Sequence, residues 1–207
     1  DCKFREDGEG MCSNLKYETT DSKLQPDVST ESNIKNRRSD QDLCLLTELD
    51  NKKMKTVYSN YVIKRIQILT FFDNKNLTHI YFDESTKLET IEAGAFKTCT
   101  NLSKCTILSN KLKTIGEFAF YKCTKLEEVK LNKCNKLGDS CFSGCTKLNK
   151  IEIHTHINNK DRTTPIGNYC FYNCNVLKTV LINFSKVGHF AFMRSDTSSM
   201  LVLLESA

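Results

Sequence analysis

The stretch IGEFAFYKCTKLEEVKL, from Ile115 to Leu131, decides the fold, because its pattern of apolar residues returns along most of the chain. The pattern is I-x-x-x-A-F-x-x-C-x-x-L-x-x-V-x-L, where x is any residue. Four close copies and two weaker ones follow one another, and the phenylalanine of the pattern recurs every 21 to 29 residues. Such self-similarity predicts a solenoid, in which each repeat forms one coil that stacks on its neighbours. The six phenylalanines are Phe71, Phe96, Phe120, Phe142, Phe171 and Phe192.

The two halves of each copy have different periods. In the second half, Val129 and Leu131 alternate with a charged residue, as the inward residues of a short strand do. In the first half, Ile115, Ala119 and Phe120 are spaced four and one apart, which suits a short helical turn. One copy cannot bury this apolar stripe alone, so neighbouring copies must supply the walls of the core. The sequence therefore predicts an α/β solenoid with one parallel β-sheet face and short helical turns opposite.

The chain divides into three predicted parts. Residues 1–38 are polar and aperiodic and are expected to form an N-terminal arm. Residues 39–65 are expected to cap the array, with a helix over 40–49 that starts at a capping-box-like Ser39 and Asp42 and leads into a partial repeat. Six repeats follow, over residues 66–90, 91–114, 115–136, 137–165, 166–186 and 187–207.

Eight of the eleven cysteines occupy core positions of the repeat pattern. Four lie three residues after the phenylalanine, and the others replace the small residue before it or an aliphatic residue. A free cysteine behaves as a small hydrophobe, and equivalent Cβ vectors of stacked coils run parallel, whereas a disulfide needs them to converge. We therefore expect buried, reduced thiols at Cys99, Cys123, Cys145, Cys174, Cys141, Cys170, Cys105 and Cys134.

Three cysteines lie outside the repeats, and a disulfide is the expected role for two of them. Cys2 and Cys12 flank a glycine-containing turn, so a bridge between them would close a small loop in the arm. Pairing with Cys44 is the alternative. Zinc binding is not expected, because no C-x₂-C pair accompanies a second such pair or an H-x₃-H pair.

No motif for catalysis, cofactor binding or nucleic-acid binding occurs in the sequence. A G-x-S-x-G elbow, a phosphate-binding loop and a paired acid and base are all missing, and buried thiols would be poor nucleophiles. His154 and His156 lack an evident third metal ligand. No apolar run approaches membrane-spanning length. We therefore expect a chain that is not an enzyme and that has no metal, no cofactor and no transmembrane segment.

Two segments of the chain carry a family resemblance. Residues 112–131, LKTIGEFAFYKCTKLEEVKL, and residues 88–102, LETIEAGAFKTCTNL, resemble the BspA-type leucine-rich repeat, whose hallmark is L-x-x-I-x-x-x-A-F-x-x-C-x-x-L-x-x-I-x-I. The resemblance covers about residues 54–204. The chain departs from the hallmark at Thr70 and Asn74 in the first copy, at Ser195 and Ser198 in the last copy and at an insertion in the fourth.

The resemblance implies a right-handed, curved leucine-rich-repeat array with a parallel sheet along one face. It also implies a surface or secreted protein of a bacterium or a parasitic protozoan, of a kind often linked to adhesion to host matrix or cells. The family has no catalytic residues that could be carried over to this chain.

The candidate binding residues are the strand residues that the repeat pattern leaves undefined. They vary from copy to copy and mix charged with apolar side chains, as protein-binding faces do. In a curved solenoid they line the concave sheet face. The insertion HTHINNKDRTTP, residues 154–165, is a second candidate, because insertions in repeat arrays form loops. The expected ligand-binding residues are Tyr81, Lys104, Thr106, Glu128, Lys130, Asn132, Lys150, Glu152 and His154.

The sequence favours a non-enzymatic protein-binding or adhesion module, secreted or at the cell surface, that binds a host receptor, a matrix protein or a complex subunit. Its formal net charge of +5 would also favour acidic glycans. One alternative is a structural scaffold subunit that uses the array ends, because the last copy reaches Leu201 and Leu203 without a polar cap. Another is an intracellular interaction protein, which many reduced thiols would suit.

Overall fold

The computed structural model describes residues 41–43, 56–59, 63–153, 164–182, 186–195 and 201–202. The arm expected over 1–38, the expected Cys2–Cys12 bridge and His154 lie outside these residues. We number the coils of the solenoid in chain order, from the first coil, which begins at Ile66, to the sixth, which begins at Val187.

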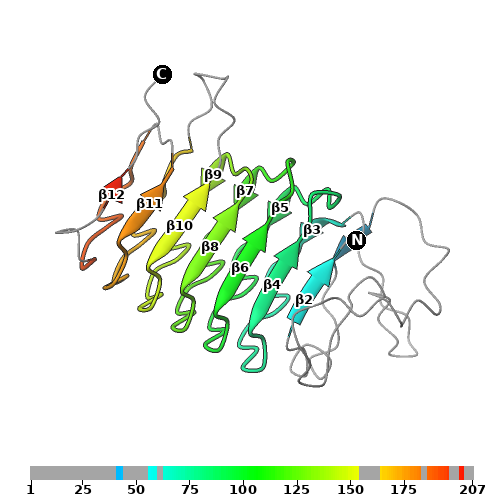
Figure 1. Ribbon diagram of the computed structural model, residues 1–207, viewed down its shortest axis with the longest axis horizontal. Coiled ribbons are helices and arrows are strands. Elements are labelled where there is room, and N and C mark those ends of the chain that lie inside the picture. Colours follow the sequence, from blue (N-terminus) through cyan, green and yellow to red (C-terminus); the bar gives the residue numbers. More distant parts are fainter. Residues whose placement is uncertain are drawn as a thin grey trace.

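Seven parallel strands form the larger of two sheets and lie side by side along the long axis of the molecule (Figure 1). Neighbouring strands pair so that equivalent residues of successive repeats lie opposite each other, as Cys105 does with Val129. Buried residues alternate with exposed or half-buried ones along the five inner strands of this sheet, so one side of these strands faces the core. In sheet order the strands are β2 (Thr56–Ser59), β4 (His79–Phe82), β6 (Lys104–Ile107), β8 (Glu128–Leu131), β10 (Lys150–Ile153), β11 (Thr179–Leu181) and β12 (Leu201–Val202).

A second parallel sheet passes through the first aliphatic residue of the repeat pattern. Bridges from Leu137 to Ile166 and from Ile166 to Val187 continue its line into the fifth and sixth coils. The prediction of one sheet face was therefore incomplete, because this residue pairs with its equivalent in the next coil and does not open a helical turn. The strands of this sheet are β1 (Gln41–Leu43), β3 (Ile63–Ile66), β5 (Thr90–Ile91), β7 (Thr114–Ile115) and β9 (Lys136–Leu137).

The third side of each coil is a hydrogen-bonded turn. In the third coil, the backbone N–H groups of Phe118, Phe120 and Lys122 donate to carbonyl oxygens of the fourth coil over 3.0, 2.8 and 2.8 Å. The N–H groups between them donate three residues back within the turn. Positive φ at Phe118 (55°) and Lys122 (56°) turns alternate N–H groups towards the next coil. The solenoid is thus confirmed, but the expected helical turns are not formed, and the described residues contain no helix.

The N-terminal helix predicted over 40–49 is wrong at its first turn. Gln41–Leu43 forms β1, which pairs with β3 at the edge of the smaller sheet. A strand at this place satisfies backbone groups at the edge of β3, a long-range demand that the local capping signal at Ser39 and Asp42 does not reveal. The rest of the predicted helix, residues 44–49, lies outside the described residues.

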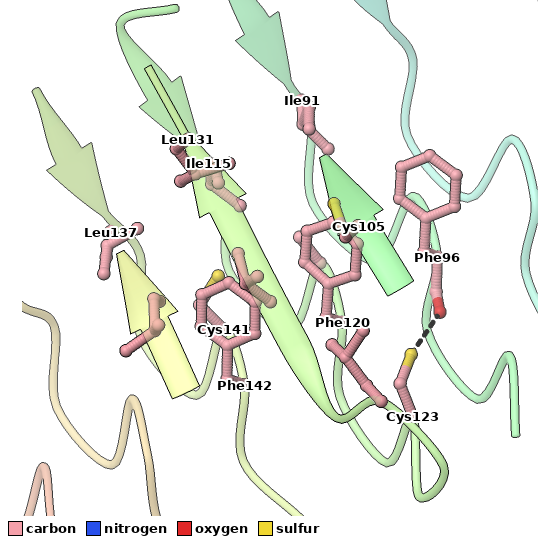
Figure 2. Packing of buried hydrophobic residues seen from close by; sticks show 14 of the residues in the cluster. Ile91, Phe96, Cys105, Ile115, Phe120, Cys123, Leu131, Leu137, Cys141 and Phe142 are labelled. Carbon is pink, nitrogen blue, oxygen red and sulfur yellow. Dashed lines mark hydrogen bonds between the residues drawn. The ribbon is translucent and has the colours of Figure 1, made fainter. Parts of the chain in front are cut away.

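The core is built around a stack of phenylalanine rings, part of which is drawn in Figure 2. Neighbouring rings have centroids 5.0 to 5.6 Å apart and interplanar angles of 2° to 14°. The first five rings are fully buried, and Phe192 of the sixth coil packs against them half-buried. The cysteines of the pattern are buried beside this stack. The residues predicted for the core therefore lie in one continuous cluster that runs through all six coils.

The cysteine that follows each core phenylalanine also has a hydrogen-bonding role. The thiol of Cys123 donates to the backbone carbonyl oxygen of Phe96, one coil earlier, over 3.2 Å (Figure 2). The other cysteines at this position make the equivalent contact. In the sixth coil Ser195 stands there, and its hydroxyl donates to the carbonyl of Phe171 over 2.7 Å. The position thus takes a small side chain that donates a hydrogen bond, and Ser195 keeps that chemistry.

Candidate functional site

The outer side of the seven-stranded sheet, which we call the sheet face, carries two columns of outward side chains in register. Neighbouring strands lie about 4.8 Å apart, so successive members of a column are side-chain neighbours. Seven of the nine residues predicted for ligand binding lie in these columns. In order, the columns are His79, Lys104, Glu128, Lys150 and Thr179, and Tyr81, Thr106, Lys130, Glu152 and Leu181.

The charges of the sheet face are partly paired with each other. Lys150 Nζ lies 2.7 Å from Glu152 Oε1 and 3.7 Å from Glu128 Oε1. The hydrogen bond with Glu152 raises the pKa of Lys150, so this cluster keeps its charges at neutral pH. Lys104 and Lys130 are exposed, and neither forms an ion pair with another described residue. The two columns hold three lysines and two glutamates, and the lysines without an ion-pair partner among the described residues lie on β6 and β8.

His79 and Tyr81 head the two columns. Partial burial lowers the pKa of His79, and the positive charge of Lys104 lowers it further, so the imidazole is neutral at pH 7. Its Nδ1 lies 2.9 Å from Thr78 Oγ1. Tyr81 is 37% exposed. This end of the face therefore combines an aromatic ring and a neutral imidazole with a nearby lysine.

Asn132 and His154 stand apart from these columns. Asn132 follows β8, and its Nδ2 donates to the backbone carbonyl of Leu108 over 3.2 Å and to Asn110 Oδ1. These bonds hold the corner where the chain leaves the larger sheet, which gives Asn132 a structural role. His154 and the insertion up to residue 163 lie outside the described residues, so the loop stays a sequence-based prediction.

A second surface, which we call the turn face, was missed by the sequence analysis. It is the outer side of the turns, where each coil presents the residue before the small residue of the pattern and the residue after the core phenylalanine. The side chains of Phe118, Tyr169 and Phe190 are 40%, 41% and 57% exposed. In four of the six coils these positions hold large side chains, which are Leu69, Phe72, Phe118, Tyr121, Tyr169, Tyr172, Phe190 and Met193.

The fourth coil interrupts the turn face and leaves an open groove of about 490 Å³. Its two serines stand where the flanking coils carry aromatic residues. The walls are two edge-to-face aromatic pairs, one in the third coil and one in the fifth, with ring centroids 5.6 and 6.0 Å apart. The groove extends onto the sixth coil, and its lining residues are Phe118, Tyr121, Ser140, Ser143, Tyr169, Tyr172, Phe190 and Met193.

Cations lie over several rings of the turn face. Lys97 Nζ is 5.6 Å from the ring centroids of both Phe118 and Tyr121. Lys122 Nζ is 5.2 Å from the centroid of Tyr121. These are cation–π distances, and they place positive charge on an otherwise apolar surface.

The sequence did contain a signal for this surface. Phe118 and Tyr121 flank the A-F pair of the third copy, and Tyr169 and Tyr172 flank the C-F pair of the fifth. These positions vary between copies, so the repeat pattern leaves them undefined. Their alignment on one outer face becomes evident only once the turns are known to be stacked in register.

The buried cysteines of the repeats are unsuited to nucleophilic chemistry. The repeat cysteines are free and buried. Burial raises the pKa of Cys99 and Cys134 to about 12 and holds the pKa of Cys123 well above its usual value, so these thiols stay protonated and unreactive. No three of the described His, Cys, Asp and Glu side chains gather as a metal site would require. Within the same ranges, no helix has the length and apolarity needed to cross a membrane.

Comparison with known families gives a match over most of the chain. The model of the BspA type leucine rich repeat region matches residues 49–163 and 154–205, with six copies. This match confirms the resemblance seen in the repeat pattern. No curated protein sequence matches the chain.

Solved structures with a similar fold include proteins described as leucine-rich. A leucine rich repeat protein of T. pallidum has a TM-score of 0.55 and 18% identity, and the match covers 74% of this chain and 87% of that one. A leucine rich cell surface protein from Faecalibacterium prausnitzii A2-165 has a TM-score of 0.53 and 25% identity over 65% of this chain and 35% of that one.

A third similar structure is the pneumococcal vaccine antigen PcpA, with a TM-score of 0.51 and 21% identity over 76% of this chain and 34% of that one. At this identity, the T. pallidum and pneumococcal matches speak for the fold alone. The chain spans about a third of the length of the F. prausnitzii and pneumococcal proteins.

Proposed function

The chain belongs to the BspA-type leucine-rich repeat family, and from this membership and the sheet face we propose that it is a non-enzymatic protein-binding or adhesion module, secreted or displayed at the cell surface. The observation that carries the proposal is the pair of registered columns on the sheet face. Their side chains take no part in the core, and repeat arrays use such faces to bind partners. The partner is a host receptor, a matrix protein or a subunit of a surface complex.

The charge distribution of the sheet face favours an acidic partner. Lys150 is largely neutralised by Glu128 and Glu152. Lys104 and Lys130, on neighbouring strands, supply the remaining positive charge, and complementary charge speeds and orients association. The ring of Tyr81 lies two strands from Lys130 and supplies the kind of aromatic side chain that contributes most to interfaces. Acidic glycans would meet the same lysines and are the second class of ligand.

Display outside the cell is supported by the description of one similar structure, the F. prausnitzii protein, as a leucine rich cell surface protein. Labelling of intact source cells with a membrane-impermeant biotin reagent tests the location. The proposal expects the chain among the labelled proteins while a cytosolic marker stays unlabelled. Recovery of the chain only after lysis contradicts surface display and favours the intracellular alternative.

Charge reversal tests the sheet face directly. Lys104→Glu combined with Lys130→Glu should weaken binding to immobilised matrix proteins and to candidate host cells about ten-fold or more. Lys136→Glu, on exposed β9 of the smaller sheet, is the matched control and should bind as the unmodified chain does. If the double variant binds normally, the ligand site lies elsewhere. Replacement of residues 154–165 by a short glycine-serine linker then tests the loop.

A further inference from the structure

The groove over the fourth coil has a width that suits one inserted side chain. The third and fifth coils lie two rungs apart, which is about 10 Å. A ring packed between two other rings needs about 7 to 8 Å, the sum of two van der Waals contacts. Ser140 and Ser143 leave this space open because their side chains end where the neighbouring coils carry rings. The groove therefore has room for one aromatic or large aliphatic side chain.

The backbone of the turn does not require large side chains at the groove walls. Phe118 and Tyr169 have positive φ of 55° and 53°, and a Cβ in this conformation is strained relative to glycine. The equivalent position has positive φ in the other coils as well, and Gly94 and Ser140 hold it in the second and fourth, so the fold accepts a small residue there. Both rings are nevertheless about two fifths exposed, and a cluster of large exposed apolar side chains is a mark of a binding surface.

Two cations lie over aromatic rings that line the groove. Lys122 Nζ is 5.2 Å from the ring of Tyr121, and Arg194 Cζ is 5.7 Å from the ring of Tyr172. The stem of Lys122 lies across Gly144, where an added Cβ would come within 3.1 Å of Lys122 Cγ. Neither cation forms an ion pair with another described residue. Both are therefore available to a carboxylate of a partner.

The carboxylates next in sequence to the groove residues do not pair with these cations. Asp139 accepts hydrogen bonds from the backbone N–H and the Nδ2 of Asn168, over 2.8 and 3.1 Å. Glu117, which precedes Phe118, is exposed and forms no ion pair with another described residue. A second copy of the chain placed groove to groove would bring the same cations together, and like charges disfavour such a symmetric contact. An acidic partner fits better than a second copy.

We propose that the groove over the fourth coil docks one aromatic or large aliphatic side chain of an acidic protein segment. The side chain enters between the two aromatic pairs, and a neighbouring carboxylate of the segment meets Lys122 and Arg194. The inference shares with the proposed function only the premise that the ligand is a protein, and it places the contact on a different face.

Filling the groove without disturbing the coil tests this inference. Ser143→Tyr should fold, because Tyr121 and Tyr172 occupy the same position in the flanking coils, and its ring should occupy the groove. Ser143→Ala leaves the groove open and is the matched control at the same residue. Lys122→Glu reverses the charge at the mouth, and Lys136→Glu on the smaller sheet controls for net charge. Circular dichroism establishes that each variant folds as the unmodified chain does.

The probes are short labelled peptides with a central Trp, Leu or Ala flanked by either Asp or Lys, and binding to the full chain is followed by fluorescence polarisation. The Trp peptide with Asp flanks should bind at least about ten-fold more tightly than its Lys-flanked and Ala-centred counterparts. Ser143→Tyr and Lys122→Glu should each weaken that binding by about ten-fold, while both controls stay within about two-fold. The absence of binding, indifference to the flanks, or normal binding by Ser143→Tyr overturns the proposal.

Two further measurements test whether the groove binds a second copy of the chain or a glycan. Sedimentation velocity that shows a dimer abolished by Ser143→Tyr would assign the groove to a second copy and overturn the proposal. Binding of a heparin-derived oligosaccharide that Ser143→Tyr abolishes, with no peptide binding, would assign it to a glycan and also overturn it. The sheet-face variant with Lys104→Glu and Lys130→Glu should bind the peptides normally. The groove proposal and the sheet-face proposal are thus tested by different variants, so one can be overturned without the other.

Discussion

The sheet face and the turn face are built on the same coils by the same stacking, yet they expose opposite kinds of surface. The sheet face presents charges that are partly paired, as Lys150 is with Glu152 and Glu128. The turn face presents aromatic rings, among them Phe118 and Tyr169, at backbone positions with positive φ. The repeat constrains only the inward residues, so each outer face is free to take its own chemistry.

The two faces also differ in what lies beneath them. Behind the sheet face the inward residues are mainly aliphatic, as Ile80 and Val129 are. Behind the turn face lie the phenylalanine stack and the thiols that hydrogen-bond to it, such as Cys123. Most of the buried thiols therefore lie behind the turn face, although Cys105 lies on β6, behind the sheet face. Alkaline pH, which deprotonates the thiols, should therefore destabilise the packing behind the turn face most.

The largest expected effect is a loss of stability at alkaline pH. The folded pKa of Cys99 and of Cys134 is about 12, above the 9.0 of an unperturbed thiol, because burial disfavours the thiolate. The stabilisation is fully present below pH 9 and is lost as pH rises towards 12, since the unfolded chain then releases protons that the folded chain retains. Each buried thiol should lower the unfolding free energy by about 1.4 kcal/mol per pH unit in that window.

Urea unfolding followed by circular dichroism at pH 8 and pH 10 measures this loss. Cys123→Ser is the control, because a serine hydroxyl keeps the hydrogen bond to Phe96, as Ser195 does to Phe171, and does not titrate. The loss of unfolding free energy between pH 8 and pH 10 should be smaller in this variant by the contribution of one thiol. Equal stability of the unmodified chain at the two pH values would mean that the thiols are not buried as described.

The next effect separates core from surface within one turn. Phe120 stacks between Phe96 and Phe142, with centroid distances of 5.1 and 5.2 Å, and is fully buried. Phe120→Ala should cost about 3–5 kcal/mol of unfolding free energy, because it opens a cavity in the middle of the stack. The same change at Tyr121, which lies on the turn face, should cost far less. Urea unfolding of both variants measures the two losses of unfolding free energy. Similar losses would contradict the assignment of Phe120 to the core and Tyr121 to the surface.

The inward half of this fold was predictable because stacking forces it to repeat. Phe120, Cys123, Leu126 and Val129 recur in the sequence because each must meet its equivalent in the next coil. The turns were harder, because a spacing of four, one and three residues fits a helix as well as a turn with two left-handed residues. Only hydrogen bonds to the next coil, such as that from Phe120, distinguish the two, and these are long-range.

Close packing between coils was also invisible to the repeat pattern. An added Cβ at Gly138 would lie 2.6 Å from the backbone nitrogen of Glu117, so glycine lets the coils approach at this corner. Of the two candidate sites, one was predictable from the sequence and the other was not. The columns of the sheet face followed from strand alternation, whereas the turn-face groove depends on two serines between aromatic coils, a contrast that needs the three-dimensional register.

A smaller effect should expose the strain of the turn face. At Phe118, where φ is 55°, glycine should be more stable than alanine by about 1 kcal/mol, because alanine keeps a Cβ in the left-handed region. At Tyr121, which lacks positive φ, the order should reverse by about 0.5–1 kcal/mol. Urea unfolding of the four variants gives both differences. An unreversed order would remove backbone strain from the case for a binding surface.

The smallest effect concerns the ion pairs of the sheet face. Glu152→Gln should leave the midpoint of urea unfolding unchanged, since exposed ion pairs contribute little to stability. It should lower the pKa of Lys150, because the hydrogen bond with Glu152 is the main cause of the raised value. Glu128→Gln should lower it less, since Glu128 Oε1 lies 3.7 Å from the ammonium group and Glu152 Oε1 lies 2.7 Å from it. An NMR titration of the Lys150 side chain measures both shifts. Equal shifts would mean that both carboxylates hold Lys150 alike, and absent shifts would mean that Lys150 is as available to a ligand as Lys104 and Lys130.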